Sequence, residues 1–399
     1  MNIGLGVRDL TISGGTQRQV IELARGLLAQ GHAVTLYCCD LNRDRCYPDR
    51  LAGLSIIALR EGVTAVETAS AHPSWPGRAA YYARRYRAQR ADALSLAERM
   101  DPATDLFNAH DHDAGWLGDR VRRRLGIPTV WMINDLPRSF FPRSGPVAAA
   151  LGRAALGWNV NILERRIARG YDRLIVLDRR NQALVRAATG VEATVVRSGL
   201  DLAACTFRPR EAPPAGRPLA LLCVGALFPW RRYEDAIAAL APLAVAGRAA
   251  RLTIVGHRGR APAYAARLER LAAGAAGPVT LTGDLPEPAL REAIAAADVF
   301  LFPASPQTWG LTVFEAMAAG TPAVVSRGAG ASEVLVDRDT AMLVNPGRPA
   351  ALAAAISALA ADPALYAGLS LKGRRFVETT LSWERYAADM GALFATLRR

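Results

Sequence analysis

Short apolar segments alternate with longer amphipathic ones along the whole chain, and this alternation constrains the fold more than any other feature. The apolar segments are 3–7, 33–38, 106–109, 129–133 and 173–177 in the first half, and 219–225, 252–256, 279–282, 299–303, 323–326 and 341–344 in the second. Strands separated by helical stretches in this way are typical of parallel sheets with helices on both faces. The sequence therefore predicts an α/β protein.

A segment dense in proline and charge, 208–218, separates the two halves and is typical of a linker. We expect two doubly wound domains, 1–205 and 206–381, with a terminal helix over 382–397. In sheets of this kind ligands bind beyond the carboxyl ends of the strands. The site is therefore expected in a cleft between the two domains.

The chain is strongly basic, with a formal net charge of +13, but its residue types argue against a nucleic-acid partner. Among 49 Lys and Arg residues only Lys372 is lysine, and the arginines are spread among acidic residues instead of forming one stripe with aromatics. An anionic small substrate fits the same charge. The helical stretch 76–98 is basic and carries aromatics, so it either contacts anionic lipid head groups weakly or is a solvated surface helix.

Two further features predict a cytoplasmic protein. The five cysteines form no CxxC pair and several lie in apolar segments, as expected for reduced structural thiols. The first residues carry Arg8 and lack the apolar core of a secretory signal, and no apolar run is long enough to span a membrane.

The segment 303–320 carries the clearest chemical signal. A strand ends near Pro303, and a helix is expected to begin at Gly310 or Leu311. The N–H groups of Gly310, Leu311 and Thr312 would then be unpaired at a helix N-terminus, which favours an anion such as phosphate. Glu315, one turn on, either accepts hydrogen bonds from two hydroxyl groups of a ribose or serves as an ordinary first-turn carboxylate.

This segment resembles the retaining glycosyltransferases of family GT4, whose pattern is a glutamate, seven residues and a second glutamate. Here the pattern runs from Gln307 to Glu315, and the resemblance extends over almost the whole chain. The other matching segments are the glycine loop 14–17, the turns 198–201 and 329–333, the segment 343–347 and the closing residues 382–384. The resemblance implies a GT-B fold of two Rossmann-like domains, with 382–399 crossing back to the first domain.

The resemblance also implies a set of site residues. Arg231 stands where the family has a lysine that binds the donor diphosphate, with Arg232 beside it, and Asn134 stands where the family has its active-site histidine. The donor site would comprise Gly15, Arg231, Arg232, Gln307, Gly310, Leu311, Thr312 and Glu315. The acceptor site would comprise Thr16, Gln17, His110 and Asp111, and catalysis would involve Arg231, Asn134 and Asp135.

Three positions depart from the family pattern. The first glutamate is Gln307, the arginine expected after Gly225 is Ala226, and the histidine is Asn134. An amide forgoes charge-assisted hydrogen bonds, and Asn134 cannot take a proton, although Asp135 can. These changes predict an unusual donor sugar or acceptor.

The segment His110 to Asp113 permits three interpretations: contact with the acceptor, plain loop structure, or a metal site. The resemblance argues against metal, because the family neutralises the diphosphate with cationic side chains and backbone amides. We therefore expect no metal and no cofactor besides the donor substrate.

The sequence thus predicts a metal-independent retaining glycosyltransferase. It would move a sugar from a UDP- or GDP-type donor to a small-molecule, glycan or lipid acceptor. Two alternatives stay open. One is a catalytically weak binding or partner subunit, which the three departures favour. The other is an epimerase or phosphorylase of the same fold, although the 307–320 segment is not their pattern.

Overall fold

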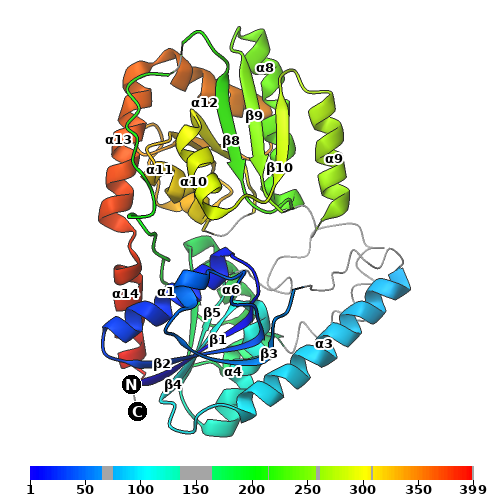
Figure 1. Cartoon of the computed structure of the whole chain (residues 1–399), viewed down its shortest axis with the longest axis vertical. Helices are drawn as coiled ribbons and strands as arrows, with labels where there is room; N and C mark the ends of the chain where they lie inside the picture. Colours follow the sequence, from blue (N-terminus) through cyan, green and yellow to red (C-terminus); the bar gives the residue numbers. More distant parts are fainter. Residues whose placement is uncertain (65–74, 135–163, 214, 258–260, 307–308, 398–399) are drawn as a thin grey trace. The chain divides into compact units, whose positions relative to one another are not determined.

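The structure is a computed structural model that describes residues 1–397 except 65–74, 135–163, 214, 258–260 and 307–308. The chain forms two compact units, one of Met1–Gly199 with Trp383–Arg399 and one of Leu200–Ser382. The predicted boundary at residue 205 lies a few residues beyond this division. The terminal segment belongs to the first unit, although it follows the second in sequence (Figure 1).

The first unit contains a parallel sheet of seven strands in the order β3-β2-β1-β4-β5-β6-β7. The strands are β1 (Asn2–Leu10), β2 (Ala33–Leu41), β3 (Ser55–Glu61), β4 (Leu106–His110), β5 (Thr129–Met132), β6 (Arg173–Val176) and β7 (Thr194–Val195). Five of them were predicted, while β3 and β7 were not. Both missed strands lie at the edges of the sheet, where β3 is only partly buried and β7 has two residues.

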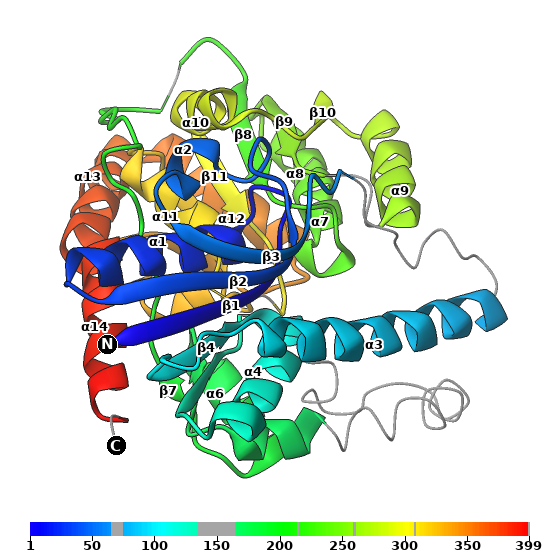
Figure 2. The same cartoon turned by 60° about the horizontal axis from the view of Figure 1, so that its bottom comes forward.

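Helices cover both faces of this sheet (Figure 2). They include α1 (Gly15–Ala29), α2 (Pro48–Leu51), α3 (Trp75–Glu98), α4 (Asp111–Leu125), α6 (Arg179–Thr189) and α14 (Trp383–Ala395). α3 packs on α4, and α14 packs on α1. The α1–α14 contact is close, since a Cβ atom on Gly26 would lie 2.3 Å from the Cβ of Ala387. Glycine at position 26 therefore allows α14 to dock.

The second unit contains a parallel sheet of six strands in the order β10-β9-β8-β11-β12-β13. The strands are β8 (Leu219–Val224), β9 (Ala250–Val255), β10 (Val279–Gly283), β11 (Val299–Phe302), β12 (Ala323–Ser326) and β13 (Met342–Val344). The helices are η3 (Pro229–Arg231), α7 (Tyr233–Ala238), α8 (Leu240–Val245), α9 (Pro262–Ala273), α10 (Glu287–Ala296), α11 (Leu311–Ala318), η4 (Gly330–Glu333), α12 (Pro349–Ala361) and α13 (Pro363–Thr380). All six strands were predicted.

The central strands explain why the sequence signal is strong. β8 and β11 are buried almost throughout, because helices cover both faces of a parallel sheet and its inner strands become continuously apolar. Each sheet also reverses its strand order at one place, between β1 and β4 in the first unit and between β8 and β11 in the second. Loops that leave the carboxyl ends of these strands are where such folds bind ligands.

Candidate functional site

The loop that follows β8 holds Arg231 against the sheet. Gly225 directly follows the strand and has a φ of +139°, a conformation that favours glycine. A Cβ atom there would lie 2.9 Å from the Cζ atom of Arg231, so a larger residue would push the guanidinium group away. The loop then forms the short helix η3, which ends at Arg231. Gly225 thus lets the guanidinium group lie directly beyond the end of β8.

Phe302 joins this guanidinium group to the start of α11. The Cζ atom of Arg231 lies 5.4 Å from the centroid of the Phe302 ring, in a cation–π contact. On the same ring rests Gly310, whose φ is +84° and where a Cβ atom would lie 2.8 Å from the Phe302 Cζ. Sequence reasoning missed Phe302, because an aromatic residue at the end of a buried strand has the pattern of an ordinary core residue.

Gly310 caps the N-terminus of α11, and Leu311 is the first residue of the helix. The first N–H groups of a helix lack intrahelical acceptors and carry the positive end of its dipole. The hydroxyl oxygen of Thr312 is buried and has no hydrogen-bond partner among the described residues. Glu315 lies one turn further along the helix and is half-buried. This end of α11 and Arg231 lie on the same Phe302 ring, and we call them the anion-binding arrangement because their positive charge favours an anion. Gln307 lies outside the described residues.

The guanidinium group of Arg232 is paired with a carboxylate. Its Nε atom donates to the Asp235 carboxylate at 2.7 Å, and a second contact joins the same two groups at 3.1 Å. Asp235 also accepts a hydrogen bond from the backbone N–H of Gly347 at 3.1 Å. The guanidinium group of Arg232 is thus engaged in a bidentate ion pair, which argues against its predicted role as a second cation beside Arg231.

In the first unit, the glycine loop leads from β1 into α1. Gly15 is the first residue of α1. The side-chain amide of Gln17 donates to the backbone oxygen of Asp9 at 3.2 Å, which ties Gln17 to the end of β1. The hydroxyl oxygen of Thr16 accepts a hydrogen bond from the amide of Asn134 at 3.4 Å. The structure thus brings Thr16 and Asn134 together, whereas Gln17 braces the loop.

Asn134 follows β5 and is 6% exposed. Its side-chain oxygen is buried and has no hydrogen-bond partner among the residues that the structure describes. A buried amide oxygen without a partner is unfavourable, so a hydroxyl group from a ligand would stabilise it. Asp135, the predicted proton acceptor, lies outside the described residues.

His110 lies in the core of the first unit, which argues against its predicted contact with an acceptor. It is the last residue of β4 and is fully buried. Its Nε2 atom lies 2.8 Å from the Oδ1 atom of Asn108, whose amide nitrogen donates to the backbone oxygen of Val130. Burial lowers the pKa of His110 to about 3, so the imidazole is neutral at pH 7.

Asp111 is the first residue of α4 and has a strained conformation with a φ of +73°. Its carboxylate accepts hydrogen bonds from the backbone N–H groups of Ala114 at 2.9 Å and Arg8 at 3.3 Å. Burial and the neighbouring Asp113 raise the pKa of Asp111 to about 7. His112 instead pairs with Glu164 at 2.6 Å. Within the described part of the chain, no three His, Cys, Asp or Glu residues gather as a metal site would require.

The basic helix α3 is partly tied to α4. Arg84, Arg85, Arg87 and Arg90 are exposed, and the Nη2 atom of Arg85 lies 3.0 Å from a carboxylate oxygen of Asp113. This ion pair favours the interpretation of α3 as a solvated surface helix. No single described helix is both long and apolar enough to cross a membrane.

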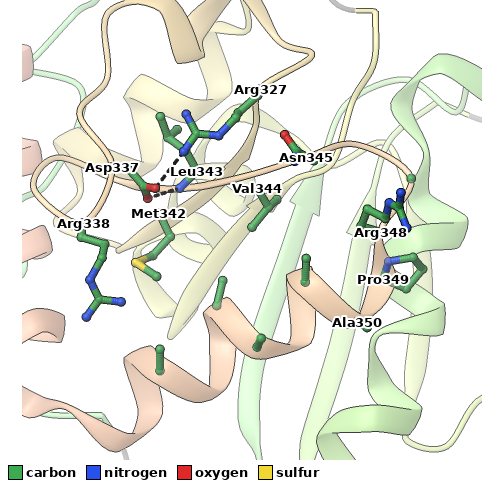
Figure 3. A pocket seen from close by; sticks show the side chains of 15 residues that line it. Arg327, Asp337, Arg338, Met342, Leu343, Val344, Asn345, Arg348, Pro349 and Ala350 are labelled. Atoms are coloured by element: carbon green, nitrogen blue, oxygen red, sulfur yellow. Dashed lines mark hydrogen bonds and ion pairs between the residues drawn. The ribbon is translucent and has the colours of Figure 1, made fainter.

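A groove of about 1000 Å³ opens beside β13 in the second unit (Figure 3). Alanines of α12 form one wall, and Arg327, Arg338 and Arg348 lie around it. Arg327 pairs with Asp337 at 2.8 Å, and Asp337 also accepts the outward N–H of Leu343 on β13. The groove contains none of the predicted donor-site residues.

Two family models match the chain. The model described as Glycosyltransferase Family 4 covers residues 13–204, and the model described as Glycosyl transferases group 1 covers residues 218–362. Among curated proteins, the chain is 28% identical to a GDP-mannose-dependent alpha-(1-6)-phosphatidylinositol dimannoside mannosyltransferase of Mycobacterium tuberculosis, covering 96% of this chain and 93% of the relative. It is also 28% identical to a D-inositol 3-phosphate glycosyltransferase of Acidothermus cellulolyticus, covering 90% and 80%.

Solved structures share the fold at low sequence identity. Sucrose-phosphate synthase from Thermosynechococcus elongatus matches with a TM-score of 0.73 and 23% identity, over 100% of this chain and 99% of that one. HepE of Anabaena in complex with UDP-glucose matches with a TM-score of 0.72 and 16% identity, over 100% of both chains. The predicted GT-B architecture of two Rossmann-like domains is thereby confirmed.

Proposed function

This chain belongs to glycosyltransferase family 4, and on that premise we propose that its second unit binds a nucleoside diphosphate sugar for transfer without a metal ion and with retention at the anomeric carbon. The acceptor is proposed to be a small polyhydroxylated molecule, a glycan or a lipid head group. The relatives named above, which act on phosphatidylinositol dimannoside or inositol 3-phosphate, support this acceptor class.

The observation that carries the proposal is the arrangement of Arg231 and Gly310 on the ring of Phe302. In the transfer, the bond between the anomeric carbon and the diphosphate oxygen breaks while an acceptor oxygen forms the new bond. Negative charge then develops on the diphosphate. A guanidinium group and the N-terminus of a helix are fixed positive groups that stabilise such charge. They supply the neutralisation that a metal ion provides in other enzymes.

Thr312 and Glu315, both on α11, have roles in the same proposal. The hydroxyl group of Thr312 lies at the first turn of α11 and has no partner among the described residues, so it is available to donate to a phosphate oxygen. Glu315, on the same helix, is proposed to accept hydrogen bonds from the ribose hydroxyl groups. Gln307 is proposed to contact the transferred sugar.

In the first unit, Thr16 and Asn134 are proposed to bind a hydroxyl group of the acceptor. Asn134 keeps a buried oxygen without a partner among the described residues, and Thr16 lies 3.4 Å from its amide nitrogen. Amide and hydroxyl groups recognise sugar hydroxyls because each can donate and accept. Asp135 is proposed to take the acceptor proton, since its neighbour Asn134 cannot.

The test is a transfer assay with the purified chain in the presence of EDTA. UDP-glucose, GDP-mannose, ADP-glucose and dTDP-glucose are each incubated with myo-inositol 1-phosphate, methyl α-mannoside or a glucan oligosaccharide. The proposal expects release of one nucleoside diphosphate together with a glycoside whose anomeric configuration, read by NMR, matches that of the donor. An inverted product would overturn the assignment of retention. Nucleotide binding without turnover on any pair would favour the catalytically weak binding subunit.

A further inference from the structure

Two aromatic side chains on the loop after β8 form a stacked pair that the proposed function does not yet use. The rings of Phe228 and Trp230 have centroids 4.3 Å apart and planes inclined by only 12°. Trp230 is 39% exposed, whereas Phe228 is half-buried beneath it. One face of the Trp230 ring is thus stacked on Phe228, while the residue remains well exposed.

The backbone holds this pair in place. The N–H of Arg231 donates to the carbonyl oxygen of Phe228 at 2.9 Å, which closes the η3 turn around Pro229. The carbonyl oxygen of Trp230 accepts a hydrogen bond from the N–H of Ser305 at 2.8 Å. The turn is thus fixed both internally and to the loop that leads from β11 to α11. A ring on such a turn is preorganised, because little conformational freedom remains to be lost on binding.

The turn that carries the pair adjoins the anion-binding arrangement. Trp230 directly precedes Arg231, and its hydrogen-bond partner Ser305 lies on the loop that ends at Gly310. A diphosphate bound between Arg231 and Gly310 carries its sugar on the terminal phosphate, one bridging oxygen away. The sugar ring is therefore confined to the neighbourhood of these two loops.

We propose that Trp230, supported by Phe228, stacks against the ring of the sugar carried by the donor nucleotide and contributes to the choice of that sugar. One face of a pyranose ring carries several C–H groups and is largely apolar. An aromatic ring can therefore cover that face while the hydroxyl groups at the ring edge remain free for hydrogen bonds. This inference rests on the proposed function, since it needs a nucleotide sugar at Arg231.

The departures from the family pattern give an aromatic contact a larger share in the recognition of the sugar. The chain has Ala226 and Gln307 where the family pattern has an arginine and a glutamate, so two charged groups near the diphosphate and the sugar are absent. Stacking depends on shape and apolar area instead of charge. A sugar held in this way would be recognised mainly by the C–H face that it presents.

The experiment compares each nucleotide with its sugar-bearing form by calorimetry on the full chain. The pairs are UDP and UDP-glucose, GDP and GDP-mannose, ADP and ADP-glucose, and dTDP and dTDP-glucose. The variants are Trp230→Ala, Trp230→Phe and the matched control Leu271→Ala, which removes an apolar side chain that is 38% exposed on α9. Thermal unfolding of each variant reports whether the loop change destabilises the unit.

We expect Trp230→Ala to weaken binding of the sugar nucleotide by about 3- to 10-fold, the range for loss of an aromatic stack, with the nucleoside diphosphate unchanged within about twofold. Trp230→Phe should restore most of the affinity and Leu271→Ala should match the wild type. Equal losses for both forms would place Trp230 at the base or phosphates and overturn the proposal. Unchanged affinity for the sugar nucleotide would overturn it too. If the wild type binds no nucleotide, the proposed function itself fails, which is a separate result.

Discussion

The guanidinium carbon of Arg231 lies 5.4 Å from the centroid of the Phe302 ring, and the same ring supports Gly310 at the N-terminus of α11. One buried aromatic side chain thus sets the spacing between a cation and a helix dipole. Phe302 is the last residue of a central strand and is 2% exposed, so its position is fixed by the core. The site is preorganised by packing, which is what stabilisation of a developing anion requires.

Gly310→Ala tests whether this spacing matters. The φ of +84° disfavours any side chain there, at a cost of about 1–2 kcal/mol. In addition, the new Cβ would meet the Phe302 ring at 2.8 Å. We expect loss of nucleotide affinity together with a lower melting temperature. The matched control is Gly247→Ala, before the start of β9, where φ is +68° but no atom lies within 4 Å of the new Cβ.

Calorimetry and thermal unfolding of both variants separate backbone strain from the clash. Gly247→Ala should lower the melting temperature only through the backbone strain and should leave nucleotide binding unchanged. Equal losses of stability and full nucleotide affinity in Gly310→Ala would contradict the role of the Phe302 contact.

Gly26→Ala tests the docking of α14 on α1. A helical glycine replaced by alanine normally stabilises a protein by up to about 1 kcal/mol. At Gly26 we expect the opposite sign, because the added Cβ would lie 2.3 Å from that of Ala387. Gly368→Ala on α13 is the control and should stabilise, since nothing lies within 4 Å of its new Cβ. Differential scanning calorimetry measures the change in melting temperature of each variant. Stabilisation by both variants would argue against a tight α1–α14 contact.

Because His110 is buried in its neutral form, we expect the free energy of unfolding to decrease at acidic pH. Its pKa is about 3 in the folded state and 6.5 when unperturbed, so only the unfolded state binds the proton between these values. Stability contributed by the neutral imidazole is therefore present above pH 6.5 and is lost as the pH falls. Between pH 7 and pH 5 the loss amounts to about 2 kcal/mol.

The comparison is with His110→Gln, whose side chain is neutral at every pH. Urea unfolding of both proteins at pH 7 and pH 5 should show a larger decrease in the free energy of unfolding for the wild type. Asp111 has a raised pKa, which makes the free energy of unfolding increase as the pH falls. Because Asp111 is present in both proteins, its contribution cancels in the comparison. The same decrease in both proteins would mean that His110 is protonated in the folded state at pH 5.

Much of the fold could be predicted from the sequence because its inner strands are continuously apolar. β8 and β11 are buried on both faces, so their apolar runs can be recognised without knowing which strands lie beside them. β3 was missed because an edge strand is only half-buried and its residues do not form a clear apolar run. The start of α11 was predicted from local chemistry, since glycine at a strand-to-helix turn is a local signal.

The interactions between side chains were harder to predict. The local sequence does not predict that Arg231 lies on Phe302 while Arg232 pairs with Asp235, because the two arginines are adjacent and chemically alike. The partner of each arginine is decided by which carboxylate or ring the fold brings near. For the same reason, His110 has the sequence pattern of a polar loop residue, although β4 extends one residue further and buries it.

The most direct test of the account is calorimetric titration of UDP, GDP, ADP and dTDP in EDTA against three proteins: the wild type, Arg231→Ala and Arg232→Ala. The wild type should bind one nucleotide best. Arg231→Ala should weaken that binding by about 10- to 100-fold, as expected for the loss of charge-assisted contacts worth about 1.5–3 kcal/mol. Arg232→Ala should bind within about twofold of the wild type and lose only stability, because its guanidinium group is paired with Asp235. Equal weakening in both variants, or unaltered binding in Arg231→Ala, would contradict the assignment of the donor site.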